Sequence, residues 1–231
     1  TSVFGEAFED GEPYGAARVL FIDQGGDSGV TTIEPGSYQV VVSHGPEYSL
    51  STHNITVTAG ATTTVNATVE RVVDTSGFIA GDFHVHSIDS PDAAVTRADR
   101  VRSMLAEGLD FFASTDHDIR TDFTQTISDL GASSLLGTAV GAEMTTFDYG
   151  HFNGWPLTIN PAQVNGGSVD HGGAAADGMD FPSLSSYSLD PNSIINAALA
   201  DPCVDTVQIN HIHSHFGLDG GSGLAIDTAL T

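Results

Sequence analysis

The 231-residue chain is long enough to bury a sizeable core in one large domain or two modest ones. Thirty Asp and Glu residues against six Arg and no Lys give a formal net charge of −24, which excludes nucleic acid and anionic membrane surfaces as expected partners. The one cysteine excludes an intrachain disulfide. No apolar run reaches the 18 residues expected of a membrane span, and no basic N-terminus followed by an apolar segment indicates a retained signal peptide.

The acidic composition and the absence of Lys have two explanations. In a high-salt habitat, screening over about 3 Å at 1 M salt removes the self-repulsion of such a surface. Compositional drift in a GC-rich genome would produce the same bias. Two glycosylation sequons, Asn54-Ile55-Thr56 and Asn66-Ala67-Thr68, are compatible with export. We therefore expect a secreted or cell-surface protein of a salt-adapted microbe.

Residues 1–76 are predicted to form a small antiparallel β-sandwich of the immunoglobulin-like or carboxypeptidase-regulatory-like kind. Segments rich in Val, Thr and Tyr alternate there with turn clusters. The predicted strands are Ala17–Ile22, Ser37–Ser43, Asn54–Thr58 and Thr62–Val73. No catalytic motif stands out in this part, and its two histidines, His44 and His53, are expected at the surface.

Residues 77–231 are predicted to form a second domain, in which strands alternate with helices. Phe78–His86 is a predicted strand, and Ser90-Pro91 is typical of a helix N-cap with Pro at the first helical position. Apolar residues at helical spacing follow until Gly108, and Leu109–Ser114 is then a buried strand. This β-α-β unit is typical of a parallel sheet or an α/β barrel.

The later elements are less regular. Leu135–Ala142, His151–Leu157 and Val204–Asn210 are predicted strands, and Ser193–Ala200 is a predicted helix. Asn165–Ser188 is rich in Gly, Ala and Ser without periodicity, which predicts a long loop or an insertion.

Metal-ligand residue types gather at the C-terminal ends of these strands, where α/β folds place their sites. On the first of the strands, the two-residue period puts Asp82, His84 and His86 on one face. The candidate ligands are His84, His86, Asp92, Asp116, His117, Glu143, His151 and His211, with Asp82, His213 and His215 behind them. His213 and His215 are expected at the surface or as loop caps rather than as ligands.

The chemistry of this residue set points to catalysis by metal ions. Imidazole and carboxylate without thiolate favour Zn, Mn or Fe, in a catalytic rather than a structural site. A carboxylate such as Glu143 could bridge two ions, which together activate a water and stabilise a leaving oxygen. The implied reaction is hydrolysis.

Nucleophilic catalysis by Ser or Cys is disfavoured. The sequence has no Gly-x-Ser-x-Gly elbow, and Cys203, between Pro202 and an apolar strand, is predicted to be a buried small hydrophobe. No phosphate loop or dinucleotide fingerprint occurs either.

The segments Gly81–Ser87, Glu107–Asp110 and Ser114–Asp118 resemble the PHP (polymerase and histidinol phosphatase) family. Three later segments are similar to its carbaryl-hydrolase-like branch of metallohydrolases: Glu143–Thr146, Gly150–Asn153 and Gln208–His211. The resemblance covers about residues 78–216. It implies an α/β fold, a distorted β/α barrel that holds two or three divalent ions at its C-terminal mouth.

The resemblance also implies roles for single residues. His84 and His86 match the family's first ligand pair and Glu143 its bridging carboxylate, which makes these three the expected catalytic residues. His151 and His211 match further ligands.

Two departures from the family pattern bear on the site. His117 matches a ligand of a third ion, whose acidic partner here is Asp92 or Asp89, because Pro91 interrupts the usual spacing. No late Asp-x-His pair follows His215. We therefore expect that the chain is a fragment or that the barrel is completed from outside these residues, by a missing C-terminal segment or in a homo-oligomer.

Two functions from different classes follow. The first is a metal-dependent hydrolase in which a bridging hydroxide attacks a phosphoester, a carboxylic ester or an amide of a small molecule, with Arg120 as the substrate-binding cation nearest to a motif. The second is an extracellular structural or assembly subunit, in which edge strands of the sandwich mediate association and the metal site only stabilises the fold.

Overall fold

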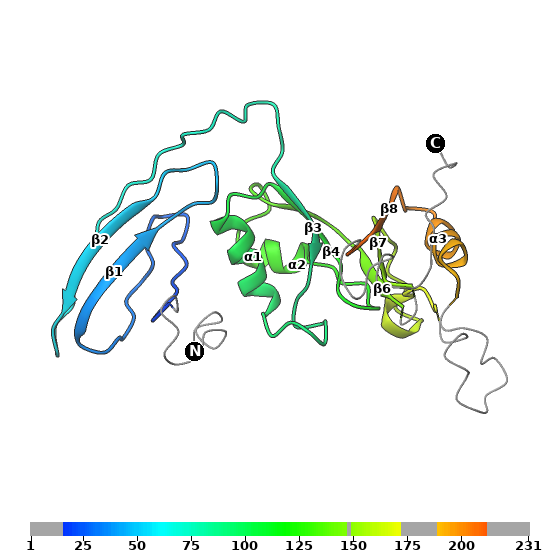
Figure 1. Ribbon diagram of the computed structural model, residues 1–231, viewed down its shortest axis with the longest axis horizontal. Helices are drawn as coiled ribbons and strands as arrows, with labels where there is room; N and C mark the ends of the chain where they lie inside the picture. Colours follow the sequence, from blue (N-terminus) through cyan, green and yellow to red (C-terminus); the bar gives the residue numbers. More distant parts are fainter. Residues whose placement is uncertain (1–15, 147–148, 172–188, 212–231) are drawn as a thin grey trace. The chain divides into compact units, whose positions relative to one another are not determined.

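A computed structural model describes residues 16–146, 149–171 and 189–211 (Figure 1). The chain divides into two compact units: the first takes in residues up to 81, 95–111 and 126–136, and the second 82–94, 112–125 and 137 onward. The strands are β1 (Gly36–Val42), β2 (Ser51–Val57), β3 (Gly81–Val85), β4 (Phe111–Ser114), β5 (Gly137–Ala139), β6 (Ala142–Thr145), β7 (His151–Trp155) and β8 (Thr206–Ile209). The helices are α1 (Arg97–Ala106), α2 (Thr124–Asp129), the short 3-10 helix η1 (Val164–Gly166) and α3 (Pro191–Leu199).

The first unit contains one two-stranded sheet. β1 and β2 pair antiparallel, and in both strands half-buried residues alternate with exposed ones. The predicted strands at 17–22 and 62–73 are not strands in the structure, apart from a single bridge between Arg71 and Tyr48. Residues 61–64 are all exposed, so the Thr-rich alternation there has no apolar face to bury. The described residues thus show one antiparallel pair where a sandwich was expected.

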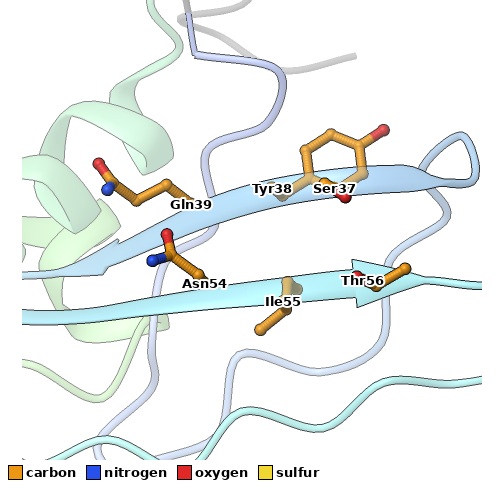
Figure 2. A pocket seen from close by; sticks show the side chains of 6 residues that line it. All are labelled: Ser37, Tyr38, Gln39, Asn54, Ile55 and Thr56. Atoms are coloured by element: carbon orange, nitrogen blue, oxygen red, sulfur yellow. The ribbon is translucent and has the colours of Figure 1, made fainter.

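A shallow hollow lies over β1 and β2 (Figure 2). Six residues line it: Ser37, Tyr38, Gln39, Asn54, Ile55 and Thr56. None of them is an imidazole or a carboxylate, and the hollow holds no candidate metal ligand.

The predicted β-α-β unit is present, with α1 between β3 and β4. The backbone N–H of Asp110 donates to Ala80 and that of Thr115 donates to Val85, so the two strands run in the same direction. α1 begins later than predicted, because Thr96 and not Ser90 caps it: the Thr96 hydroxyl accepts from the backbone N–H of Asp99.

The second unit contains a three-stranded antiparallel sheet in the order β6-β7-β8. Only residues 146–150 separate β6 from β7, too few for a crossover helix, so an antiparallel pairing is the available connection. α3 lies beside this sheet (Figure 1), and its Ile194 and Ala198 pack against Met144 of β6 and Phe152 of β7, all four fully buried. No closed barrel forms among the described residues; the fold there is mixed α/β with small sheets.

Three further expectations can be compared with the described part of the chain. Cys203 is exposed rather than buried, because it lies in the turn before β8 and its backbone N–H donates to Asp201. The predicted helix at 193–200 begins two residues earlier, where Asp190 caps it. The longest described helix, α1, has ten residues, and none of the described helices is long and apolar enough to cross a bilayer.

Candidate metal centre

Glu143 is the centre of the site, and the backbone of β6 fixes its position. Its side chain has no exposed surface. Its backbone N–H donates to Asp116 at 3.1 Å and its carbonyl accepts from Asp118 at 2.9 Å, so His117 is held beside it. The loop that follows β4 is thereby joined to β6.

Both oxygens of the Glu143 carboxylate face imidazoles. Oε2 lies 3.3 Å from His84 Nε2 and 2.9 Å from His86 Nε2, and 3.3 Å from His117 Nδ1. Oε1 lies 3.1 Å from His151 Nδ1 and 3.2 Å from His211 Nε2. Five of the eight predicted ligands therefore surround the predicted bridging residue.

The five imidazoles form a closed ring around this carboxylate. Their successive centroids lie 5.0, 4.5, 5.4, 5.3 and 5.0 Å apart, in the order His84, His86, His117, His151, His211 and back to His84. They arrive from five segments: β3, the turn after it, the loop after β4, the start of β7 and the residues after β8. The Glu143 carboxylate thus faces imidazoles carried by five separate segments of the second unit.

The spacing of these atoms suits metal ions. Atoms that ligate one ion at about 2.1 Å lie roughly 3.0 to 3.4 Å from one another, and the nitrogen–oxygen separations around Glu143 are 2.9 to 3.3 Å. Among the described residues, two groups of three have ligand atoms close enough to share an ion. One is His84, Glu143 and His211, and the other is His86, His117 and Glu143. Glu143 Oε2 is also buried without a hydrogen bond from the described residues, although three imidazole nitrogens face it. An orphaned buried anionic oxygen of this kind fits a cation.

The electrostatics of the centre follow from this crowding. Burial alone would raise the pKa of Glu143, but the nearby imidazoles of His151, His84 and His86 outweigh burial and hold the pKa far below its usual range. Burial would likewise lower the pKa of His86, yet the carboxylates of Glu143 and Asp92 raise it to about 9. In the protein without ions, a positive charge on His86 therefore balances the buried carboxylate.

Asp92 is the one predicted acidic ligand, besides Glu143, that joins the cluster. Both of its oxygens lie 3.0 Å from His86 Nδ1, and Oδ2 lies 3.4 Å from His117 Nε2. Burial raises its pKa, but hydrogen bonds from His86 and Ser90 outweigh burial and lower the pKa to about 2. A carboxylate behind a ligating imidazole fixes the tautomer of that imidazole, here with Nε2 of His86 toward Glu143.

The other predicted acidic residues point elsewhere. Asp116 is fully buried and accepts from the backbone N–H and hydroxyl of Ser87, so its carboxylate holds the turn after β3. Asp82 accepts from the backbone N–H of His84, and Asp89 accepts from the Ser87 hydroxyl. These carboxylates shape the loops that carry the imidazoles and belong to neither three-ligand group.

Arg120, expected to bind substrate, is already engaged. Its guanidinium pairs with Asp201 at 2.6 Å and also donates to the Thr158 carbonyl, and the two charged side chains are only 8% and 6% exposed. A guanidinium buried in this way is not available to a substrate anion, so the geometry replaces the expected binding role with a structural one.

Two further residues join the site, Asn153 and Asn210, which the sequence analysis includes only as parts of motifs. Asn210 Nδ2 donates to Glu143 Oε1 at 2.9 Å and to Asn153 Oδ1 at 2.7 Å, and Asn153 Nδ2 donates to the Phe83 carbonyl. Both Asn side chains are buried, and together they orient the carboxylate from β3, β7 and β8. The signal was available: Asn153 stands two residues after His151 on the same strand, and therefore on the same face.

Two more predicted residues, His213 and His215, lie outside the described residues, as does the sequence in which a late Asp-x-His pair was sought.

Comparisons with known proteins give one finding. No family model and no curated protein matches the chain. Among solved structures, a match is found to a two-domain protein containing a predicted PHP-like metal-dependent phosphoesterase from Bacteroides vulgatus ATCC 8482, with 30% identity and a TM-score of 0.28. The match covers 37% of this chain and 28% of that one, so this chain spans less than a third of its length. A similarity of that extent does not establish a shared fold, and the function is therefore argued from the geometry around Glu143.

Proposed function

We propose that this protein is a hydrolase that depends on divalent metal ions, with Glu143 bridging two of them. His84 and His211 would hold one ion, and His86 and His117 the other, in accord with the two groups of ligand atoms around the carboxylate. Zn, Mn and Fe suit these ligands. The observation that carries the proposal is a fully buried carboxylate with imidazole nitrogens within 3.3 Å of each of its oxygens.

Ions in such a site would polarise a scissile carbonyl or phosphoryl group and lower the pKa of water. The chain's own residues prepare the site for them. Asn210 and Asn153 hold the carboxylate in one orientation, and Asp92 keeps Nε2 of His86 directed at Glu143. Asp116 holds the Ser87 turn that follows the first two imidazoles.

The charge of the second unit bears on the substrate class. Its residues include sixteen Asp and Glu against a single basic residue, Arg120, which is buried beside Asp201. A dianionic phosphomonoester would meet net repulsion and find no free cation in the unit that carries the ligands. Uncharged carboxylic esters and amides, or monoanionic phosphodiesters, are therefore the favoured substrates.

The test combines metal analysis with a graded substrate panel. The purified protein, loaded with Mn or Zn, is assayed on p-nitrophenyl acetate, a p-nitroanilide, bis(p-nitrophenyl) phosphate and p-nitrophenyl phosphate. We expect about two bound ions per chain by elemental analysis and turnover of at least one of the first three substrates, with the dianion poorest at low salt. Glu143→Gln keeps the shape but removes the bridging charge, and it should lose both the ions and the turnover.

Glu70→Gln is the matched control, because Glu70 is exposed and lies in the first unit. It should behave as wild type. A protein that holds no ion and turns over none of the four substrates would refute the proposal. Bound ions without turnover, together with a large particle in light scattering, would instead favour an assembly subunit. The sheet of β1 and β2 supports that alternative in one respect, since each strand has a single partner among the described residues.

A further inference from the structure

Thr145, at the end of β6, connects His117 to the backbone of Glu143. The Thr145 hydroxyl donates to the Glu143 carbonyl at 3.2 Å, and its oxygen is also in hydrogen-bond contact with His117 Nδ1. A hydroxyl has one proton to donate, so a Thr145 that donates to Glu143 accepts from His117. Nδ1 is then the protonated nitrogen of His117, and Nε2 carries the lone pair.

The nitrogen left with the lone pair faces another carboxylate. His117 Nε2 lies 3.4 Å from Asp92 Oδ2, the separation of two atoms that share one ion. The opposite tautomer would direct a proton at that position and remove the ligand atom. The hydroxyl of Thr145 thereby decides whether His117 can bind an ion from its Asp92 side.

A second pair of residues fixes Thr145 itself. Asp118 has a φ of 55°, uncommon for a residue with a side chain, and its Oδ1 accepts from the Thr145 backbone N–H at 3.0 Å. The same oxygen lies 2.8 Å from His171 Nε2, which donates to it from a loop far along the chain. The hydrogen bond to Asp118 also raises the pKa of His171.

We propose that Thr145 is a positioning residue that selects the Nδ1–H tautomer of His117, and that Asp118 and His171 hold Thr145 in place to do so. The inference rests on the proposed function in so far as His117 binds an ion, and it changes one detail of that function: the ion would be bound through Nε2, on the Asp92 side, and not through the Nδ1 that lies 3.3 Å from Glu143 Oε2. Nothing in the sequence motifs separates Thr145 from the neighbouring Thr146, whose hydroxyl donates to Gly150 instead.

Thr145→Val removes the hydroxyl and keeps the shape of the side chain, and Thr145→Ser restores the hydroxyl. Thr138→Val is the matched control, because Thr138 lies on β5 of the same unit and its buried hydroxyl has no partner among the described residues. Zinc is titrated into each metal-free protein, and bound ions are counted by elemental analysis at fixed free zinc. We expect Thr145→Val to lower the affinity for the zinc ion that His117 ligates by about 10- to 100-fold. Zinc bound by the other group of ligands should be retained. Thr145→Ser and Thr138→Val should bind zinc within a few-fold of wild type.

The tautomer itself is read by long-range ¹H–¹⁵N NMR of the histidine rings, with the His117 signals assigned from their loss in His117→Gln. Wild type should show His117 protonated at Nδ1, with and without zinc, at a pH where the ring is neutral. Thr145→Val should show a mixture of tautomers, and His171→Ala should shift toward that mixture, whereas His171→Gln keeps a donor for Asp118 and should not.

Two results would overturn the inference: a wild-type His117 protonated at Nε2, or a Thr145→Val protein with unchanged tautomer and zinc affinity. The wild-type spectrum decides the matter even where a variant does not fold. Failure of the proposed function is distinct, because a wild type that binds no zinc still reports its tautomer in the metal-free spectrum.

Discussion

At the scale of single residues, the centre brings one buried carboxylate and five imidazoles together. The surrounding imidazoles lower the pKa of Glu143 at this buried position, and the carboxylates of Glu143 and Asp92 raise the pKa of His86. The arrangement couples the stability of the metal-free protein to pH.

The pKa shifts of His86 and Glu143 determine how the stability changes with pH. The pKa of His86 is raised from 6.5 to about 9 on folding, so its contribution is complete below pH 6.5 and is lost as the pH rises through 9. The pKa of Glu143 is lowered, so its contribution is present above the unfolded-state value and is lost only in acid. In a chelator, the free energy of unfolding should therefore fall by roughly 3 kcal/mol between pH 6.5 and about 9.5.

Denaturant titrations of the metal-free protein across this pH range measure the effect. His86→Gln should flatten the decline. His53→Gln is the control, because His53 lies on β2 and is not one of the five histidines around Glu143. It should leave the pH dependence of the unfolding free energy unchanged. A wild type whose stability rises over the same interval would contradict the assignment of the charge to His86.

At the scale of elements, the residues that align the site are apolar. Met144 and Phe152 lie on the face of β6 and β7 opposite to the one that carries Glu143 and His151, and Ile194 and Ala198 of α3 pack against them. Because alternate residues of a strand face opposite ways, this packing sets the direction of Glu143 and His151.

Ile194→Ala should therefore weaken both folding and metal binding. Truncating a fully buried Ile costs about 2–5 kcal/mol through lost burial and the cavity left behind. Leu199→Ala is the control, since Leu199 lies on the same helix but is 51% exposed. Thermal unfolding with and without zinc distinguishes the effects, and equal losses in the two variants would show that α3 does not support the sheet.

The elements also show which features of the site the sequence predicts and which it does not. The period of two placed His84 and His86 on one face, and each later imidazole was selected because it follows or begins an apolar run. In the structure these imidazoles surround Glu143, and their role as ligands stays a prediction. The start of α1 was misplaced, because a Ser-Pro pair that suits a cap also suits the turn that presents Asp92. Asp116 and Arg120 were assigned by their proximity in sequence, which does not reveal that Ser87 and Asp201 already occupy them. The place of Asn153 two residues after His151 puts it on the same face of the strand, but its hydrogen bond with Asn210 depends on strand register, which a single sequence does not encode locally.

At the scale of the whole molecule, a net charge of −24 means that every acidic side chain feels many like charges. This self-repulsion destabilises the compact state and is relieved when the screening length falls from about 10 Å at 0.1 M salt to about 3 Å at 1 M.

Raising NaCl from 0.1 to 1 M should therefore raise the melting temperature of the metal-free protein by several degrees. Sodium sulfate at the same ionic strength provides the control, because screening depends on ionic strength whereas preferential exclusion of sulfate adds a separate stabilisation. A melting temperature that is insensitive to NaCl, and that responds only to sulfate, would show that charge repulsion does not limit stability.

The ring of imidazoles has a last consequence, for the unfolded chain. An ion held by His84 and His211 would tie the beginning of the second unit to its last described segment, and would close a loop that includes most of the described part of that unit. In the chain-entropy model, a cross-link over a loop of about 130 residues, the separation of His84 and His211 in the sequence, restricts the denatured ensemble by an amount on the order of 5 kcal/mol. The sequence has one cysteine and no intrachain disulfide to provide such a link. The same ligands would then form a reversible cross-link, which is present when the ion is bound and lost when the ion is removed.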